Sequence, residues 1–226
     1  MEYNNILLTR ITQLKPQNVL DVGCGCGSFT IKLSFYCTEA VAIDLSEDLI
    51  ERSKKENQKP NITYLCMDGR NLSYPDNSFD LVLERATLHH TREWEKVLNE
   101  MIRVSAQHIL AEEPLDDPRS EAKKNTMQAQ KLFLELQNEV GYSHYPYLPL
   151  ENLLGYFKKR NIPLETEIIK SDEPLGLDEY FSSFGLFAEK SKRKKYWLDR
   201  LDDFKKELNG NKLCESDTLF IAAVKS

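Results

Sequence analysis

The 226-residue sequence has no apolar run long enough to cross a membrane, and its start, MEYNNILLTR, lacks the basic beginning and apolar centre of a secretory leader. It also has no excess of positive charge, because 30 lysines and arginines stand against 36 aspartates and glutamates. The net charge of −6 and the pI near 5.4 disfavour a general nucleic-acid or membrane-surface binder. We therefore expect a cytoplasmic protein.

Cysteine is present in an odd number and without a framework spacing, which favours reduced thiols over disulfides. The chain has no C-x-x-C motif and no second Cys/His pair at the spacing of zinc ligands. Glu112, Asp116 and Asp117 lie close in sequence, but no histidine shares their spacing. We therefore expect no catalytic thiol and no bound metal. The cysteines are Cys24, Cys26, Cys37, Cys66 and Cys214.

Short apolar runs alternate along the chain with segments of helical periodicity, which favours a parallel sheet covered by helices. One such helix is expected over residues 28–37, directly after the first strand. The expected strands are NVLDVG, AVAIDLS, ITYLCMD, FDLVLER, HILAEEP, LETEIIKS and DTLFIAAVKS.

Two segments interrupt this alternation, at about residues 115–150 and 172–214, and both are expected to be mostly helical. The first contains a helix over 118–140 that ends at Gly141. We find no repeat and no linker between separate cores, so residues 1–226 are interpreted as one domain. Both insertions start at the carboxyl edge of the sheet, where α/β folds bind ligands, and we expect them to form a cap on the acceptor side.

The stretch LDVGCGCGSFT places three glycines at alternate positions after the first strand. Glycines there allow a tight turn and close approach of a ligand to backbone N–H groups. The dinucleotide fingerprint G-x-G-x-x-G fits poorly, because Ser28 stands at its third glycine. Asp21, at the end of the strand, would repel a pyrophosphate but attract the sulfonium and ammonium groups of S-adenosylmethionine. The pattern favours the methyl donor over NAD.

Four motifs in order, VLDVGCGCGSFT, AVAIDLS, YLCMDGR and FDLVLERATLHH, resemble the class I S-adenosylmethionine-dependent methyltransferases. The resemblance is closest to the small-molecule branch typified by ubiquinone/menaquinone C-methyltransferases. It implies an α/β, Rossmann-like, doubly wound sheet of seven strands in the order 3-2-1-4-5-7-6, the last one antiparallel. It also implies S-adenosyl-L-methionine as cofactor and S-adenosyl-L-homocysteine as product. Because it covers residues 15–115 well and matches neither insertion, the donor site carries over and the acceptor site does not.

The resemblance implies a donor site at the ends of the first four strands. Asp44 would accept the ribose hydroxyls, Asp68 the adenine amino group, and Asp21 would face the methionine portion. Three alternatives stay open: Asp44 as a solvated or capping residue, Asp68 as a turn residue, and Arg85 in a structural ion pair. The implied donor-binding residues are Asp21, Gly23, Cys24, Gly25, Asp44, Leu45, Asp68, Gly69, Arg70, Glu84 and Arg85.

His89 and His90 follow the fourth strand, at the mouth of the expected cleft. Their near-neutral pKa suits a general base, and the alternative is that one packs while the other is solvated. Glu112 and Glu113 end the fifth strand at the same edge. Successive strand residues point to opposite faces, so only one of these glutamates is expected to face the site.

The predicted function is transfer of a methyl group from S-adenosylmethionine to a small-molecule acceptor by in-line displacement. The many aromatic residues in or beside the insertions suit an apolar or aromatic acceptor, although a small core between the insertions explains them equally well. Two alternatives remain: an RNA (tRNA) methyltransferase that uses the basic run KSKRKK at 190–195, and a non-catalytic donor-binding subunit. The sequence leaves the acceptor atom and the oligomeric state open.

Overall fold

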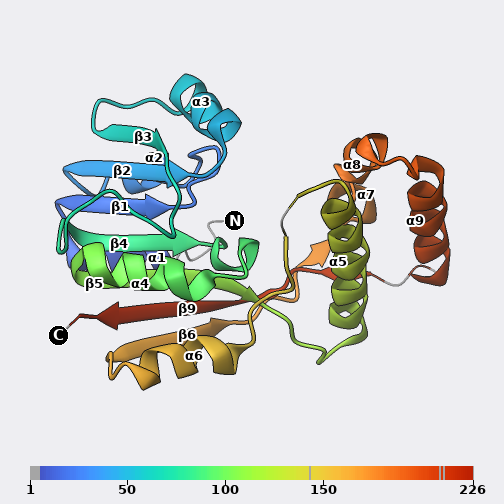
Figure 1. The fold of residues 1–226 in the computed structure, drawn as a ribbon. Helices are drawn as coiled ribbons and strands as arrows, with labels where there is room; N and C mark the ends of the chain where they lie inside the picture. The colour runs from blue at the N-terminus through green and yellow to red at the C-terminus, as the bar shows by residue number, and fades with distance from the viewer. Residues whose placement is uncertain (1–5, 143, 209, 211, 226) are drawn as a thin grey trace.

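The computed structural model describes residues 6–142, 144–208, 210 and 212–225. Its centre is a seven-stranded sheet in the order β3-β2-β1-β4-β5-β9-β6 (Figure 1). The first five strands are parallel, and β9 runs antiparallel to both β5 and β6. This confirms the predicted strand order, with the last strand inserted between the fifth and the sixth. The strands are β1 (Asn18–Val22), β2 (Glu39–Asp44), β3 (Ile62–Cys66), β4 (Phe79–Arg85), β5 (Ser105–Leu115), β6 (Leu164–Ile169) and β9 (Asp217–Val224).

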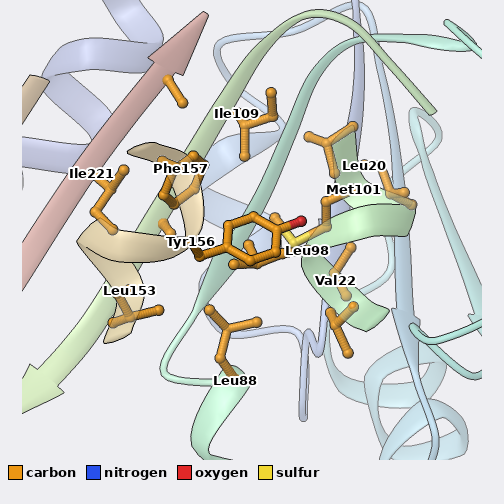
Figure 2. Packing of buried hydrophobic residues seen from close by; sticks show 14 of the residues in the cluster. Leu20, Val22, Leu88, Leu98, Met101, Ile109, Leu153, Tyr156, Phe157 and Ile221 are labelled. Atoms are coloured by element: carbon orange, nitrogen blue, oxygen red, sulfur yellow. The ribbon is translucent and has the colours of Figure 1, made fainter. Parts of the chain in front are cut away.

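Helices pack against both faces of this sheet, which is why its central strands β1 and β4 are largely buried and mostly apolar. On β1, Val19 packs with Leu7 and Leu33 on one face. Leu20 packs with Met101 on the other face, where Figure 2 shows the larger core. The helices of these two layers are α1 (Ile6–Leu14), α2 (Thr30–Leu33), α3 (Glu47–Glu56), α4 (Trp94–Val104) and α6 (Leu150–Lys159).

One predicted helix is much shorter than expected: the helix over residues 28–37 is reduced to α2, a single turn at Thr30–Leu33. Leu33 is buried, whereas Phe35 is 72% exposed. The chain turns back there because Thr38 N–H and Glu39 N–H both donate to Gln17 O, which aligns β2 beside β1.

The two insertions pack on each other and form a second core, in which Ala129 and Leu136 meet Phe184, Trp197 and Leu213. We call this part the helical region. Figure 1 shows it beyond the carboxyl ends of β1 and β4, beside the sheet. Its elements are α5 (Glu121–Glu139), β7 (Pro174–Leu175), α7 (Leu177–Tyr180), α8 (Phe184–Lys190), α9 (Lys194–Leu208) and β8 (Leu213–Cys214). Among the described residues, no helix combines the length and apolarity needed to span a membrane.

Polar groups attach the helical region to the sheet. The ammonium group of Lys123, on α5, contacts Asp217 Oδ1 at 2.6 Å and donates to Glu215 O at 2.6 Å. The Arg119 guanidinium also binds Asp217, and it reaches Asp172 Oδ1 at 3.1 Å. Lys123 and Asp217 are each only 2% exposed. Although burial raises the pKa of Asp217, the bonds from Arg119 and Lys123 lower it to about 2.

Candidate functional site

The glycine loop after β1 is held in a left-handed conformation, with φ of +74° at Gly23 and +56° at Gly25. A Cβ atom at Gly23 would lie 2.3 Å from the Thr87 side chain, so this glycine is needed for packing against the segment after β4. A Cβ at Gly25 would meet nothing within 4 Å. The loop is therefore open in front of Gly25, where a ligand has access to bare backbone.

Asp44 joins the end of β2 to this loop. Its Oδ2 accepts from Gly25 N–H at 2.9 Å, and its Oδ1 accepts from Ser46 N–H at 2.9 Å. The second bond closes a local turn, which is the capping role that the sequence left open for Asp44. A carboxylate offers about four acceptor positions, which leaves capacity on each oxygen. Leu45, the next residue, is 66% exposed beside the loop.

Asp21 lies beneath the loop and is only 2% exposed. Burial raises its pKa to about 6, although Thr30 Oγ1 donates to its Oδ2 at 2.6 Å. Burial and the nearby carboxylates of Asp21 and Asp44 raise the pKa of the Cys24 thiol strongly. The thiol stays protonated at neutral pH and is therefore a poor nucleophile and a poor metal ligand.

Asp68 and Arg70, which follow β3, form an ion pair in the structure. Arg70 Nη2 contacts Asp68 Oδ2 at 2.7 Å, and Arg70 Nη1 contacts Glu93 Oε2 at 2.7 Å. The hydrogen bond from Arg70 lowers the pKa of Asp68. Asp68 also accepts from the backbone N–H of Arg70 at 2.9 Å, as a turn residue does. Gly69 lies between them, and a Cβ there would stand 3.0 Å from Val22. An adenine contact at Asp68 stays a prediction.

The ends of β4 and β5 bring two buried carboxyl groups to one face of the sheet. Glu84 is 0% exposed and Glu113 is 1% exposed. Glu84 Oε2 accepts from Thr87 N–H at 3.0 Å, and Glu113 Oε1 accepts from Leu88 N–H at 2.8 Å. Burial, followed by the charge of Glu113, raises the pKa of Glu84 well above its usual range.

Arg85 and Glu112 are partners in the register of β4 with β5 and lie on the opposite face. Arg85 Nε lies 3.7 Å from Glu112 Oε1, which is the structural ion pair that the sequence left open as an alternative. The glutamate that reaches the histidines is Glu113. Its Oε2 lies 2.9 Å from Nδ1 of His89.

Three histidines meet at this edge of the sheet. His89 and His90 lie on the short 3-10 helix η1 (Leu88–His90), and His144 comes from the loop after α5. The ring centroids are 4.4 Å apart for His89 and His90, 4.5 Å for His90 and His144, and 5.3 Å for His89 and His144. Burial and the two neighbouring histidines lower the pKa of His144 to about 3.

His144 was not predicted as a site residue. The only local signal is its place in the aromatic, proline-rich stretch YSHYPYLP, which says nothing about proximity to His89. The aromatic residues form, in part, the small core between the insertions that the sequence left open as an alternative. Tyr147 lies beside His89, with ring centroids 5.2 Å apart, whereas Phe181 and Phe184 are buried in the core of the helical region.

The strand order, with β9 antiparallel between β5 and β6, and the glycine loop after β1 define the class I S-adenosylmethionine-dependent methyltransferase fold. Residues 20–108 match the family described as "Methyltransferase domain". This part of the chain is therefore similar to a methyltransferase domain, in agreement with the resemblance found in the sequence.

Similar proteins agree with this assignment. Norajmaline N-methyltransferase of Rauvolfia serpentina is 34% identical over 97 residues, which are 41% of this chain and 33% of that protein. Ubiquinone biosynthesis O-methyltransferase of Coxiella burnetii is 33% identical over 87 residues, 38% of this chain and 37% of that protein. The chain thus spans well under half the length of these relatives.

The crystal structure of YcgJ from Bacillus subtilis superposes with a TM-score of 0.70 at 19% identity, covering 97% of both chains. A putative methyltransferase from Bacillus halodurans gives 0.69 at 18% identity, with 98% of both chains covered. At this identity the likeness supports the fold.

Proposed function

We propose that this protein transfers a methyl group from S-adenosylmethionine to a small-molecule acceptor. The observation that carries the proposal is the open backbone at Gly25, with the carboxylate of Asp44 bonded to its N–H at 2.9 Å. The names of the similar enzymes, which methylate nitrogen in norajmaline and oxygen in ubiquinone biosynthesis, support a small-molecule acceptor.

The residues of the loop suit the donor's chemistry. Asp44 keeps acceptor capacity for two neighbouring ribose hydroxyls, and the exposed side chain of Leu45 offers an apolar surface for the adenine ring. Asp21 places a carboxylate beneath the loop, which attracts a cationic ligand once it is ionised. The donor supplies a methyl group that its sulfonium has already activated.

The chain's main contribution is then to orient the acceptor and exclude water. Holding two reactants in line accounts for about 7–11 kcal/mol of a barrier without a dedicated catalytic group. Where the acceptor carries an O–H or N–H, His89 is the proposed base: Glu113 holds its Nδ1, so Nε2 keeps a lone pair for a proton. His90 is the second candidate.

The helical region is the proposed cap over the acceptor. Its loop after α5 reaches the sheet side, where Tyr145 N–H donates to His89 O at 3.3 Å. A cap that closes on its ligands would protect its own backbone amides from exchange with solvent. Hydrogen exchange in residues 118–142 and 172–208 should therefore slow when S-adenosylhomocysteine and acceptor are added. Exchange rates that stay the same with both ligands present would mean that the helical region is not a cap.

The basic run at 190–195 gives the RNA alternative little support. Arg193 binds Glu139, Lys194 binds Glu189, and Lys195 Nζ contacts Asp199 Oδ2 at 2.7 Å. These carboxylates offset part of the positive charge that a phosphate backbone would meet at the run.

The deciding experiment is a methyl-transfer assay with labelled donor on small molecules that co-purify with the protein. We expect S-adenosylhomocysteine to form only when an acceptor is present. The Asp44→Ala variant is the negative control, and Asp48→Ala, an exposed carboxylate in the first turn of α3, is the matched control. Tight donor binding without turnover on any acceptor would favour the non-catalytic subunit, and transfer to RNA alone would favour the RNA enzyme.

A further inference from the structure

His89, His90 and His144 form a cluster, of which the proposed methyl transfer uses one ring at most. One ring nitrogen from each histidine lies within 4.8 Å of one from each of the others. Two of the rings come from η1 and the third from the loop after α5, so the fold gathers them from segments far apart in sequence. His89 is buried and His90 is exposed, which leaves the cluster accessible from one side.

The side chains around His89 fix which of its nitrogens carries the hydrogen. Nδ1 lies 2.9 Å from Glu113 Oε2, and a carboxylate only accepts, so Nδ1 donates. Nε2 therefore keeps its lone pair. Glu113 is itself held, because its other oxygen accepts from Leu88 N–H at 2.8 Å. This is the carboxylate–histidine arrangement that orients imidazole ligands at metal sites.

His144 has the same arrangement with a different partner. Its Nδ1 donates to Gln137 Oε1 at 2.8 Å, at the end of α5, so Nε2 again keeps the lone pair. That Nε2 is buried and has no hydrogen-bond partner among the residues that the structure describes. A buried acceptor without a partner is unfavourable unless a ligand binds it.

We propose that His89, His90 and His144 bind a divalent transition-metal ion of the zinc type, with Glu113 and Gln137 as positioning residues. Imidazole nitrogen is a preferred ligand for zinc, whereas magnesium and calcium prefer oxygen. Zn–N bonds of about 2.0–2.1 Å in a tetrahedral site hold imidazole centroids about 5 Å apart. The observed 4.4, 4.5 and 5.3 Å fit that spacing. Binding requires the nitrogens to approach to about 3.3 Å. His90 is exposed and its ring stacks on that of His144, so the His90 ring must turn when the ion binds.

Three protein ligands leave a fourth position open, as in catalytic rather than structural zinc sites. An acceptor oxygen, nitrogen or sulfur atom that bound there would have its pKa lowered by the ion. The ion would then activate the acceptor in place of His89. The lone pair of His89 Nε2 would bind the metal, so it could not accept a proton as well. This role rests on the proposed function, whereas metal binding itself does not.

The test uses the full chain without a polyhistidine tag, stripped with chelator and then titrated with Zn²⁺ alone by calorimetry and elemental analysis. We expect one ion per chain, and Co²⁺ in its place should give the visible absorption of a tetrahedral site. His90→Ala and His144→Ala should each weaken binding at least 100-fold. Glu113→Gln should weaken it about 10–100-fold, as loss of a group that orients a ligand does.

His108→Gln is the matched control, since His108 lies on β5 five residues before Glu113, about 16 Å along the strand. It should bind Zn²⁺ as the wild type does. Thermal unfolding without metal checks that each variant folds. If a variant at a buried position does not fold, the result for His90→Ala, at an exposed position, decides the test. Equal Zn²⁺ affinity in wild type and His90→Ala, or binding lost in His108→Gln, overturns the proposal. Donor calorimetry on the stripped protein tests the proposed function separately.

Discussion

The two sides of the candidate site are built in different ways. The proposed donor side is built from backbone: a glycine loop in a left-handed conformation, whose Gly25 N–H is bonded to the Asp44 carboxylate. The other side is built from side chains: three imidazoles, of which His89 and His144 have partners on β5 and α5. Backbone geometry follows from local sequence, whereas a side-chain cluster depends on how distant segments pack.

The largest effect is expected at the attachment of the helical region to the sheet. Asp217→Asn leaves the buried Lys123 ammonium without its carboxylate, which should lower the free energy of unfolding by about 3–5 kcal/mol. Urea unfolding measures this. Asp172→Ala is the matched control, because Asp172 binds Arg119 from an exposed position and should cost about 0–1 kcal/mol. Similar losses in the two variants would mean that the buried pair is not the main attachment.

Acid should weaken the same attachment. The pKa of Asp217 is about 2 in the folded protein, below the value of 3.8 for an unperturbed aspartate. A lowered pKa contributes stability that is complete above pH 3.8 and is lost as pH falls toward 2. The difference between wild type and Asp217→Asn in unfolding free energy should therefore shrink over that range.

The next largest effect distinguishes two glycines in one loop. Gly23→Ala combines a positive φ with a clash against Thr87 and should lower stability by about 2–4 kcal/mol. Gly25→Ala meets no neighbour, so only the cost of the positive φ remains, about 1–2 kcal/mol. The donor affinity should follow the reverse order, since a methyl group at Gly25 would occupy the open face. Urea unfolding and donor calorimetry on both variants test this prediction. If the same variant showed the larger loss in both measurements, the different roles of Gly23 and Gly25 would be contradicted.

A smaller effect is expected from the carboxylate that joins β2 to the loop. Asp44→Ala should weaken donor binding by about 1.5–3 kcal/mol, the scale of hydrogen bonds to a charged group. Calorimetry against S-adenosylhomocysteine measures it, and Asp48→Ala should bind normally. Unchanged affinity in Asp44→Ala, or tight binding of NADH by the wild type, would refute the assignment of the donor.

These comparisons also explain how far the sequence leads. The apolar runs predicted the strands, and their order followed from the resemblance, because both depend on local pattern. The length of α2 did not follow, since it is set by the bonds of Thr38 and Glu39 to Gln17 across the sheet edge. Alternation showed that Glu112 and Glu113 face opposite sides, but which one reaches the histidines required the register of β4 with β5.

The site divides in the same manner. Gly25 and Asp44 were predicted from motifs, and the structure brings them into contact at 2.9 Å. The ion pair of Arg70 with Glu93 and the approach of His144 to His89 were not predicted, because both join residues that only the tertiary fold brings together. A sequence without an alignment carries no record of such contacts.

The smallest expected effect concerns the Asp21 carboxyl group beneath the glycine loop. Because the folded pKa of Asp21 is about 6, above the 3.8 of an unperturbed aspartate, the folded state holds the proton more tightly than the unfolded one. Its contribution to stability is therefore present below pH 3.8 and is lost as pH rises through 6. Above pH 6, Asp21→Asn should be more stable than the wild type.

Donor binding should change with pH in the opposite direction, because only the ionised carboxylate attracts a cationic ligand. At pH 5 about one Asp21 side chain in ten is ionised, so donor affinity should be about tenfold lower than at pH 7. Calorimetry across this range measures the change, and Asp21→Asn should bind more weakly at pH 7 with no such dependence. A wild-type affinity that stays flat from pH 5 to 7 would mean that the loop recognises the donor through backbone contacts alone. The proposed donor side would then need no buried charge, whereas the histidine cluster depends on side chains throughout.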